Sequence, residues 1–214
     1  MRCRQGGRGV QFGAGDPAAA RRSTEPPRNK DPALVALQDW AAERHGPERT
    51  ALAQLCERFA AQSPVGPARA MPGPTGEANL YVVLPREAVL CLAETDADRL
   101  VQLAAVLAVG SRAVWPVHAQ ALYAELPEAA RERITLALDW SHAAVAYDVV
   151  LHHGSAESLR AVAAKLAQRP GAIVGVEGLA PGETEIALER LIVERSLSVN
   201  TAAAGGNATL MAIG

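Results

Sequence analysis

The sequence has few aromatic residues and no long uninterrupted apolar stretch. Aromatic residues make up 4% of the 214 residues although hydrophobic residues reach 49%, so Ala, Leu and Val must fill the core. That composition favours helices and buried parallel strands over an all-β sandwich. No apolar stretch of about 18 residues lacks charges or helix breakers, so the sequence predicts no membrane span.

Cysteine is also scarce. Cys3, Cys56 and Cys91 are odd in number and form no CxxC pair. This argues against a disulfide framework and against a zinc site, and it fits a reducing, cytoplasmic environment. Cys56 lies on the apolar face of a predicted helix and Cys91 lies within an apolar strand, so we expect both thiols in the core.

The chain as a whole has no large excess of positive or negative charge, but its first 30 residues do. The net charge is −2, which gives no general case for binding nucleic acid or an anionic membrane. Residues 1–30 hold seven Lys/Arg and two acids, a net +5, so residues 31–214 carry −7. Composition favours a disordered basic tail over a nucleic-acid arm or a targeting segment, and no apolar h-region indicates a secretory signal.

Residues 31–78 are predicted to form a helical hairpin followed by a Pro/Gly-rich linker. Asp31 and Pro32 supply an N-cap and a first-turn proline for a helix that runs to about residue 45. A second amphipathic helix follows Gly46-Pro47. The stretch "SPVGPARAMPGPTGEA" over residues 63–78 then has too many breakers for either a helix or a central strand.

Residues 79–182 alternate apolar strands with amphipathic helices. Such alternation implies βαβ units and a parallel sheet that is covered on both faces, so the predicted class is α/β with a Rossmann-like layer. The helix over 96–109 places Leu100, Leu103, Ala104 and Leu107 on one face. The predicted strands are 79–85, 88–93, 112–116, 133–138, 147–153 and 171–178, and the predicted helices are 96–109, 117–126 and 155–168.

Residues 183–214 are predicted to form a β-arm that ends in a docking motif. A partly alternating strand is followed by small residues, Gly205-Gly206 and an apolar tip. The alternative is that "TAAAGGNA" forms a phosphate-binding loop. We favour an arm, because small residues let another backbone approach closely and a free strand can pair with an exposed sheet edge. The predicted interface residues are Ser196, Leu197, Ser198, Val199, Asn200, Thr201, Gly205, Gly206, Asn207, Leu210, Met211 and Ile213.

Several motifs for catalysis or cofactor binding are missing. After the strand at 88–93 the chain offers "ETDADR", which is acidic and lacks the glycines that hold a pyrophosphate. "GVEGLAPGET" has glycines, but Glu177 and Glu183 oppose a phosphate there. His152 and His153 are adjacent on a strand and point to opposite faces, so they chelate a metal poorly. We therefore predict no catalytic, cofactor-binding or metal-binding residue in this chain.

Three segments together resemble one family. "MPGPTGEANLYVVLPREAVLCLA", "LVQLAAVLAVGSRAVWP" and "ERSLSVNTAAAGGNATLMAIG" are similar to the C-terminal region of long-form proline utilization A, and the likeness covers residues 30–214. That family unites a flavin-dependent proline dehydrogenase with an NAD-dependent L-glutamate gamma-semialdehyde dehydrogenase of the aldehyde dehydrogenase superfamily. The parent enzyme oxidises proline to glutamate with FAD and NAD.

The resemblance implies a non-catalytic partner role. In the family this region follows the aldehyde dehydrogenase domain, has a related fold, and helps to enclose the cavity used for substrate channelling. Its terminal motif docks onto the β-flap of the enzyme. The implied partner of this chain is therefore the aldehyde dehydrogenase core, in cis or in trans, with FAD and NAD bound elsewhere in the parent.

The chain also departs from the family. It lacks the catalytic cysteine and glutamate motifs of an aldehyde dehydrogenase and any region like the flavin barrel, and residues 1–29 do not resemble the preceding family sequence. We expect a fragment, or a domain that acts in trans. The alternatives are an independent NAD(P)-binding, aldehyde dehydrogenase-like oxidoreductase and a nucleic-acid binder that uses its basic tail.

Overall fold

A parallel sheet lies at the centre of the computed structural model, which describes residues 31–43, 46–73 and 76–200. Within these residues the sheet has five strands in the order β5-β4-β3-β6-β7, all parallel. The first strand of this sheet in the sequence, β3, is central. The chain then adds β4 and β5 on one side of β3 and crosses back to add β6 and β7 on the other. The strands are β3 (Ala88–Ala93), β4 (Arg112–Pro116), β5 (Ile134–Ala137), β6 (Val149–His153) and β7 (Gly175–Leu179).

A helical hairpin precedes the sheet. It consists of α1 (Pro32–Ala42) and α2 (Pro47–Gln62), both of which begin with proline in the first turn. The Asp31 carboxylate caps α1 by accepting the Ala33 amide at 2.9 Å, and it also lies 3.4 Å from the Arg133 guanidinium. The predicted N-cap is therefore confirmed, and the same side chain ties the hairpin to the sheet layer.

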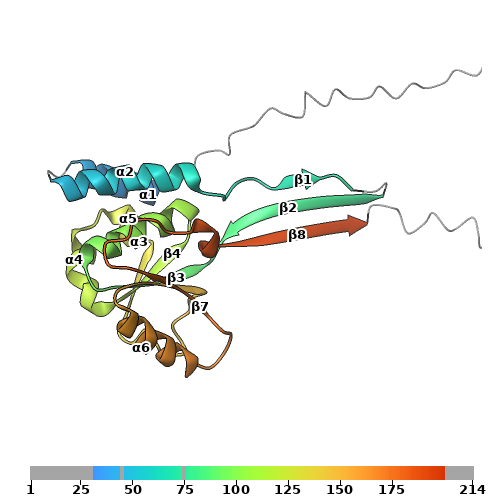
Figure 1. Cartoon of the computed structure of the whole chain (residues 1–214). Helices are drawn as coiled ribbons and strands as arrows, with labels where there is room; N and C mark the ends of the chain where they lie inside the picture. The colour runs from blue at the N-terminus through green and yellow to red at the C-terminus, as the bar shows by residue number, and fades with distance from the viewer. Residues whose placement is uncertain (1–30, 44–45, 74–75, 201–214) are drawn as a thin grey trace, which may run out of the picture.

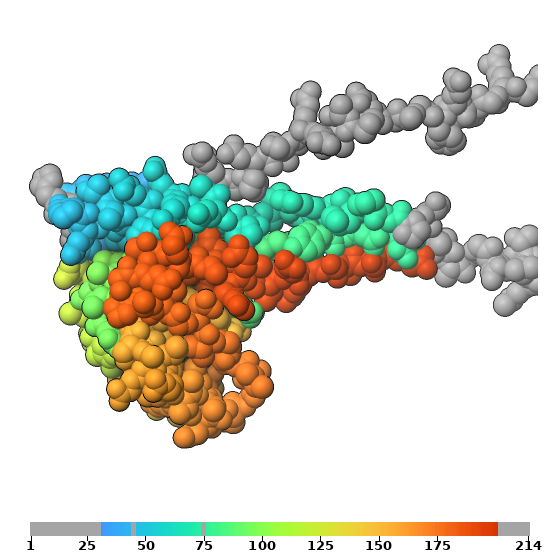
Figure 2. All heavy atoms as spheres, viewed as in Figure 1, coloured from blue at the N-terminus to red at the C-terminus, as the bar shows by residue number. Residues whose placement is uncertain are grey.

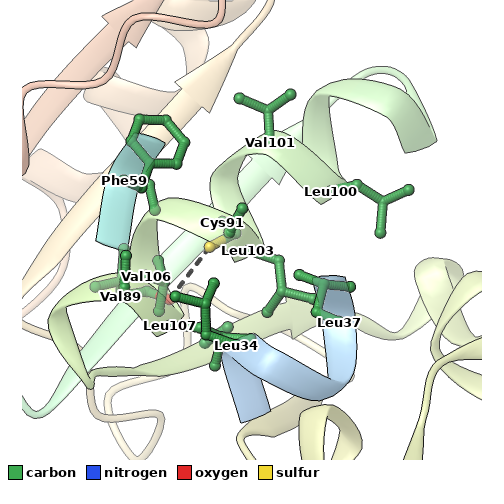
Figure 3. Close-up of a cluster of buried hydrophobic side chains, with 14 of the residues drawn as sticks. Leu34, Leu37, Phe59, Val89, Cys91, Leu100, Val101, Leu103, Val106 and Leu107 are labelled. Atoms are coloured by element: carbon green, nitrogen blue, oxygen red, sulfur yellow. Dashed lines mark hydrogen bonds between the residues drawn. The ribbon is translucent and has the colours of Figure 1, made fainter. Parts of the chain in front are cut away.

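The helix α3 (Asp96–Val109) is buried on all sides because it lies between the sheet and the hairpin (Figure 1). The sequence predicted a single apolar face, but Val101, Ala105 and Val106 on the other faces are also buried. A helix that is apolar all round fits such a position. Figure 3 shows Cys91 of β3 among side chains of α1, α2 and α3, with its Sγ 3.7 Å from the Val89 carbonyl oxygen.

The opposite face of the sheet has a thinner cover. Here α6 (Ala156–Ala167) lies over a cluster that includes Leu90, Val114 and Val150, yet no residue of α6 is fully buried. On the first face the hairpin and α3 are accompanied by short helices and turns. These are η2 (Val117–Ala119), α4 (Gln120–Glu125), α5 (Glu128–Arg131) and η3 (Leu188–Leu191).

A narrow antiparallel sheet projects from this body (Figures 1 and 2). It has the order β1-β2-β8 and contains β1 (Arg69–Met71), β2 (Glu77–Pro85) and β8 (Ile192–Asn200). β2 and β8 pair along their full lengths, from Pro85↔Ile192 at the body to Glu77↔Asn200 at the tip. We refer to these three strands as the ribbon.

The ribbon moves two of the predicted boundaries. Residues 79–85 belong to the ribbon and not to the parallel sheet, because β2 pairs with β1 and β8. The predicted terminal strand is confirmed as β8, which begins at Ile192. The predicted arm began at residue 183, but residues 183–191 run along the body and bury Ile186 and Leu191. Part of the predicted linker, Arg69–Met71, is a ribbon strand.

One strand of the parallel sheet also starts later than predicted. β7 begins at Gly175, where it first pairs with β6, and the preceding Ile173 is fully exposed. The apolar run at 171–178 is therefore divided between a turn after α6 and the strand. The predicted tail at 1–30 lies outside the described residues.

Candidate interaction surface

The two faces of the ribbon differ in polarity: one is mainly apolar, with Arg195 opposite Val82, and the other is mainly polar, with Met71 opposite Asn79. In an antiparallel pair, residues that lie opposite each other project to the same side. The pairs Leu80↔Leu197 and Ala78↔Val199 therefore share a face. Leu80, Leu197 and Val199 are 41%, 56% and 44% exposed, so this apolar face is open to solvent.

Polar contacts hold the other face together. The Ser198 hydroxyl donates a hydrogen bond to the Asn79 side chain across the two strands. Next to this pair, Tyr81 lies opposite Ser196, and a side-chain hydrogen bond with Glu194 raises the pKa of its hydroxyl. Val83, also on this side, packs against the core of the body. Only the base of this face is covered, because Ser196 and Ser198 are exposed like the residues of the apolar face.

The ribbon is anchored to the body at its base. The Arg86 amide donates to the Leu191 carbonyl oxygen at 3.0 Å, and the Arg86 guanidinium donates to the Arg190 carbonyl oxygen at 2.9 Å. Leu191 and Ile192 are buried, whereas β8 is exposed from Glu194 to its end. The ribbon is therefore anchored at its base and exposed over its outer half.

Five of the predicted interface residues lie on this ribbon. Ser196–Asn200 form the outer half of β8; Leu197 and Val199 contribute to the apolar face, and the other three residues lie on the polar face. The sequence analysis missed the share of β2, whose Ala78 and Leu80 complete the apolar face. Their alternation with Asn79 was the available signal. The remaining predicted residues, which lie outside the described part of the chain, are Thr201, Gly205, Gly206, Asn207, Leu210, Met211 and Ile213.

Acidic side chains occupy the helix N-terminus where a dinucleotide-binding fold receives phosphate. Asp98, in the first turn of α3, is buried and accepts hydrogen bonds from the Thr95 hydroxyl at 2.8 Å and from the Gly182 amide at 3.0 Å. Thr95 in turn caps the helix by accepting the Asp98 amide. A phosphate at this N-terminus would meet a buried carboxylate in place of free amides.

The start of α6 is closed in a similar way. Ser155 caps the helix, and the Glu94 carboxylate accepts the Ser158 hydroxyl at 2.8 Å and the Ser155 amide at 3.4 Å. Both helix N-termini that border the carboxyl ends of β3 and β6 therefore carry an acid. A crevice beside the start of α6, which Pro116, His118 and Trp140 also line, measures about 160 Å³, below the usual size of a ligand pocket.

The two adjacent histidines lie at the end of β6, and both are buried. His153 contacts the Glu183 carbonyl oxygen through Nε2 at 2.9 Å. Burial lowers the pKa of His152, while the nearby Glu94 carboxylate opposes that shift. Among the described residues, no group of three or more His, Cys, Asp or Glu side chains is arranged to hold a metal ion.

The two described cysteines are structural. Cys56 and Cys91 are both buried, and burial raises the pKa of each thiol to about 12. Neither is the low-pKa thiol of a cysteine nucleophile. In the part of the chain that the structure describes, no helix has the length and apolar character to cross a membrane.

The sequence of this chain is similar to part of known bifunctional PutA proteins. It is 52% identical over 184 residues to the bifunctional protein PutA of Escherichia coli and 52% identical over 183 residues to that of Salmonella typhimurium. The chain is homologous to one region of bifunctional PutA proteins. Each alignment covers 85% of this chain but only 14% of the relative. No family model matches the chain.

Solved structures show the same fold. A mutant of Bradyrhizobium japonicum proline utilization A superposes with a TM-score of 0.53 at 25% identity, over 72% of this chain and 20% of that one. An aldehyde dehydrogenase from Bacillus cereus gives a TM-score of 0.52 at 14% identity, over 69% of this chain and 37% of that one. The chain therefore shares its fold with part of each of these two proteins, and the predicted α/β class with a parallel sheet is confirmed.

Proposed function

We propose that this chain is the non-catalytic C-terminal region of a PutA-type bifunctional enzyme of proline catabolism, and that the ribbon docks it onto the aldehyde dehydrogenase core. The exposed apolar face of the ribbon is the observation that carries the proposal. In this view the parent oxidises proline to glutamate in the cytoplasm, and its FAD and NAD bind outside this chain. The 14% coverage of the relatives supports a partial polypeptide.

Energetics favour a covered ribbon. A narrow sheet with no packed layer is marginally stable in water, because its hydrogen bonds and side chains compete with solvent. Leu80, Leu197 and Val199 would each gain from burial at roughly 25 cal/mol per Å² of apolar area removed from water. An apolar surface on the dehydrogenase core would supply that cover.

The free edge of β8 suggests how residues beyond it take part. In the described ribbon β8 has β2 on one side and no strand on the other, so its outer backbone groups can pair with a further strand. We propose that residues 201–214 extend β8 and dock on the β-flap of the dehydrogenase core. The body would then lie over the core and help to enclose the cavity through which the intermediate passes.

The closed helix N-termini support the non-catalytic part of the proposal. Asp98 at α3 and Glu94 at α6 set negative charge where a dinucleotide phosphate would bind, and both carboxylates already accept hydrogen bonds within the chain. An independent NAD(P)-dependent dehydrogenase would need at least one of these N-termini free.

A binding experiment in trans tests the docking. The chain would be titrated by biolayer interferometry against a PutA protein truncated to remove the region homologous to residues 30–214. Leu197→Asp places a charge on the apolar face and should weaken binding at least about tenfold, which corresponds to about 1.4 kcal/mol. Ser196→Asp adds the same charge on the polar face and should weaken it far less.

The result that would overturn the docking model is equal binding by both variants, or no binding by the wild-type chain. Calorimetric titration with NAD and NADP tests the alternative. A flat titration supports a non-catalytic region, whereas saturable micromolar binding would favour an independent nucleotide-dependent enzyme.

A further inference from the structure

A cavity of about 310 Å³ lies between α2, α3 and α4. Figure 1 shows α4 at the end of the body away from the ribbon. It is separate from the surface that the proposed function uses. The hairpin forms one wall, the first half of α3 forms another, and the segment Gly182–Thr184 closes one side. Cavities of this size, at the junction of two packed units, are common ligand sites.

The walls of this cavity are apolar. Leu52 and Leu55 of α2 face Leu100 of α3, and Leu122 of α4 completes the lining. These leucines are between 4% and 8% exposed, whereas Leu103, deeper in α3, is fully buried. The residual exposure of the wall residues is therefore apolar surface that opens into the cavity, and a bound apolar group would remove it from water.

The rim of the cavity is acidic. Glu48, Asp96, Asp98 and Glu125 contribute four carboxylates and Arg49 one guanidinium to the lining. The Arg99 guanidinium lies 3.9 Å from Asp96 just outside the lining, so the net charge of this group is −2. The Arg49 guanidinium of α2 lies over the Trp40 ring of α1, 4.2 Å from its centroid. The charge around the opening attracts a cation and repels an anion.

We propose that this cavity binds a small organic cation: a flat apolar body between the leucines, with an amidinium or ammonium group at the acidic rim. Shape and charge agree on this class. The carboxylates would repel an anionic ligand such as a nucleotide. A purely apolar ligand would gain no electrostatic attraction from them. The proposal does not depend on the docking of the ribbon, so either can fail alone.

Two probes of matched size test the charge preference. Benzamidine and benzoate would be titrated into the full isotope-labelled chain while amide shifts are followed by NMR at low salt. Benzamidine should shift the amides of Leu52, Val101 and Leu122 with a saturable dependence, and benzoate at the same concentrations should not. Asp96→Asn removes one exposed rim charge and should weaken benzamidine binding about two- to fivefold.

A filling variant tests the location. Ala97 is exposed and lines the cavity, so Ala97→Leu should occupy the space and abolish the benzamidine shifts. Ala124→Leu makes the same change at an exposed position of α4 outside the lining and should leave binding unchanged. Equal binding of benzoate, no saturable shifts with benzamidine, or unchanged binding by Ala97→Leu would each overturn the proposal.

Discussion

The Asp98 carboxylate accepts a hydrogen bond from the Gly182 amide at 3.0 Å, which joins the first turn of α3 to the loop after β7. The same carboxylate accepts the Thr95 hydroxyl, and Thr95 caps the helix. The Asp98 amide of this helix N-terminus and the Gly182 amide thus both have acceptors within the chain. The Asp98 carboxylate is therefore an internal tether between the helix after the central strand β3 and the loop after the edge strand β7.

Removing the tether should destabilise the body. Asp98→Ala leaves the Gly182 amide and the Thr95 hydroxyl without their acceptor, and we expect the free energy of unfolding to fall by about 1–3 kcal/mol. Urea denaturation followed by circular dichroism would measure it. Asp39→Ala, at an exposed carboxylate of α1, should cost under about 0.5 kcal/mol. Equal losses in the two variants would contradict the tether.

Gly110 ends α3 in a left-handed conformation, with φ of 84°, and its amide donates to the Leu107 carbonyl oxygen. A side chain is strained there, so Gly110→Ala should destabilise the chain by about 1 kcal/mol. Gly66 has no such φ and nothing within 4 Å of an added Cβ. Gly66→Ala should therefore be neutral or slightly stabilising. Thermal melts of the two variants would compare them, and a neutral Gly110→Ala would refute the assignment.

The buried thiols should resist alkylation. Since the pKa of Cys56 and of Cys91 is about 12, almost no thiolate exists at pH 8, and neither sulfur is accessible. Iodoacetamide should label these two cysteines in the native chain far more slowly than in urea. Peptide mass spectrometry would resolve each site. Native labelling of either cysteine at the unfolded rate would show that its segment is open in solution.

Local signals in the sequence predicted the body well. The predicted bounds of α3, β3 and β4 match the structure because each segment has its own period and its own breakers, such as Gly110 after α3. The full burial of α3 was not predictable in the same way. It depends on the hairpin, whose packing against the outer side of α3 is a contact between distant segments.

The ribbon shows where a local pattern is ambiguous. The run "NLYVVLP" is as apolar as a buried parallel strand, and its neighbour β3 is one, so the sequence placed it in the same sheet. Its partner is β8, through pairs such as Leu80↔Leu197 that join segments far apart in the sequence. The apolar face of the candidate site arises only from this pairing. The sequence therefore predicted the β8 half of the face and missed the β2 half.

Stability should fall in mild acid because of His152. Burial at the end of β6 lowers the pKa of His152 below its ordinary value of 6.5; Glu94 opposes this shift and His153 adds to it. His118 lines the same crevice from the end of β4. The folded state disfavours the protonated ring, so below about pH 6.5 the unfolded chain binds more protons and the free energy of unfolding decreases.

Replacing the ring isolates this contribution. His152→Gln removes the titrating group, so the loss of stability between about pH 7.5 and about pH 5.5 should be smaller than in the wild type, even if the variant is less stable throughout. His118→Gln, at an exposed ring in the same crevice, should keep the wild-type dependence. Urea midpoints at several pH values would give both slopes. Because burial favours the neutral form of His152, removing this ring must reduce the dependence of stability on pH if His152 is its source. A full wild-type dependence in His152→Gln would show that other groups are responsible.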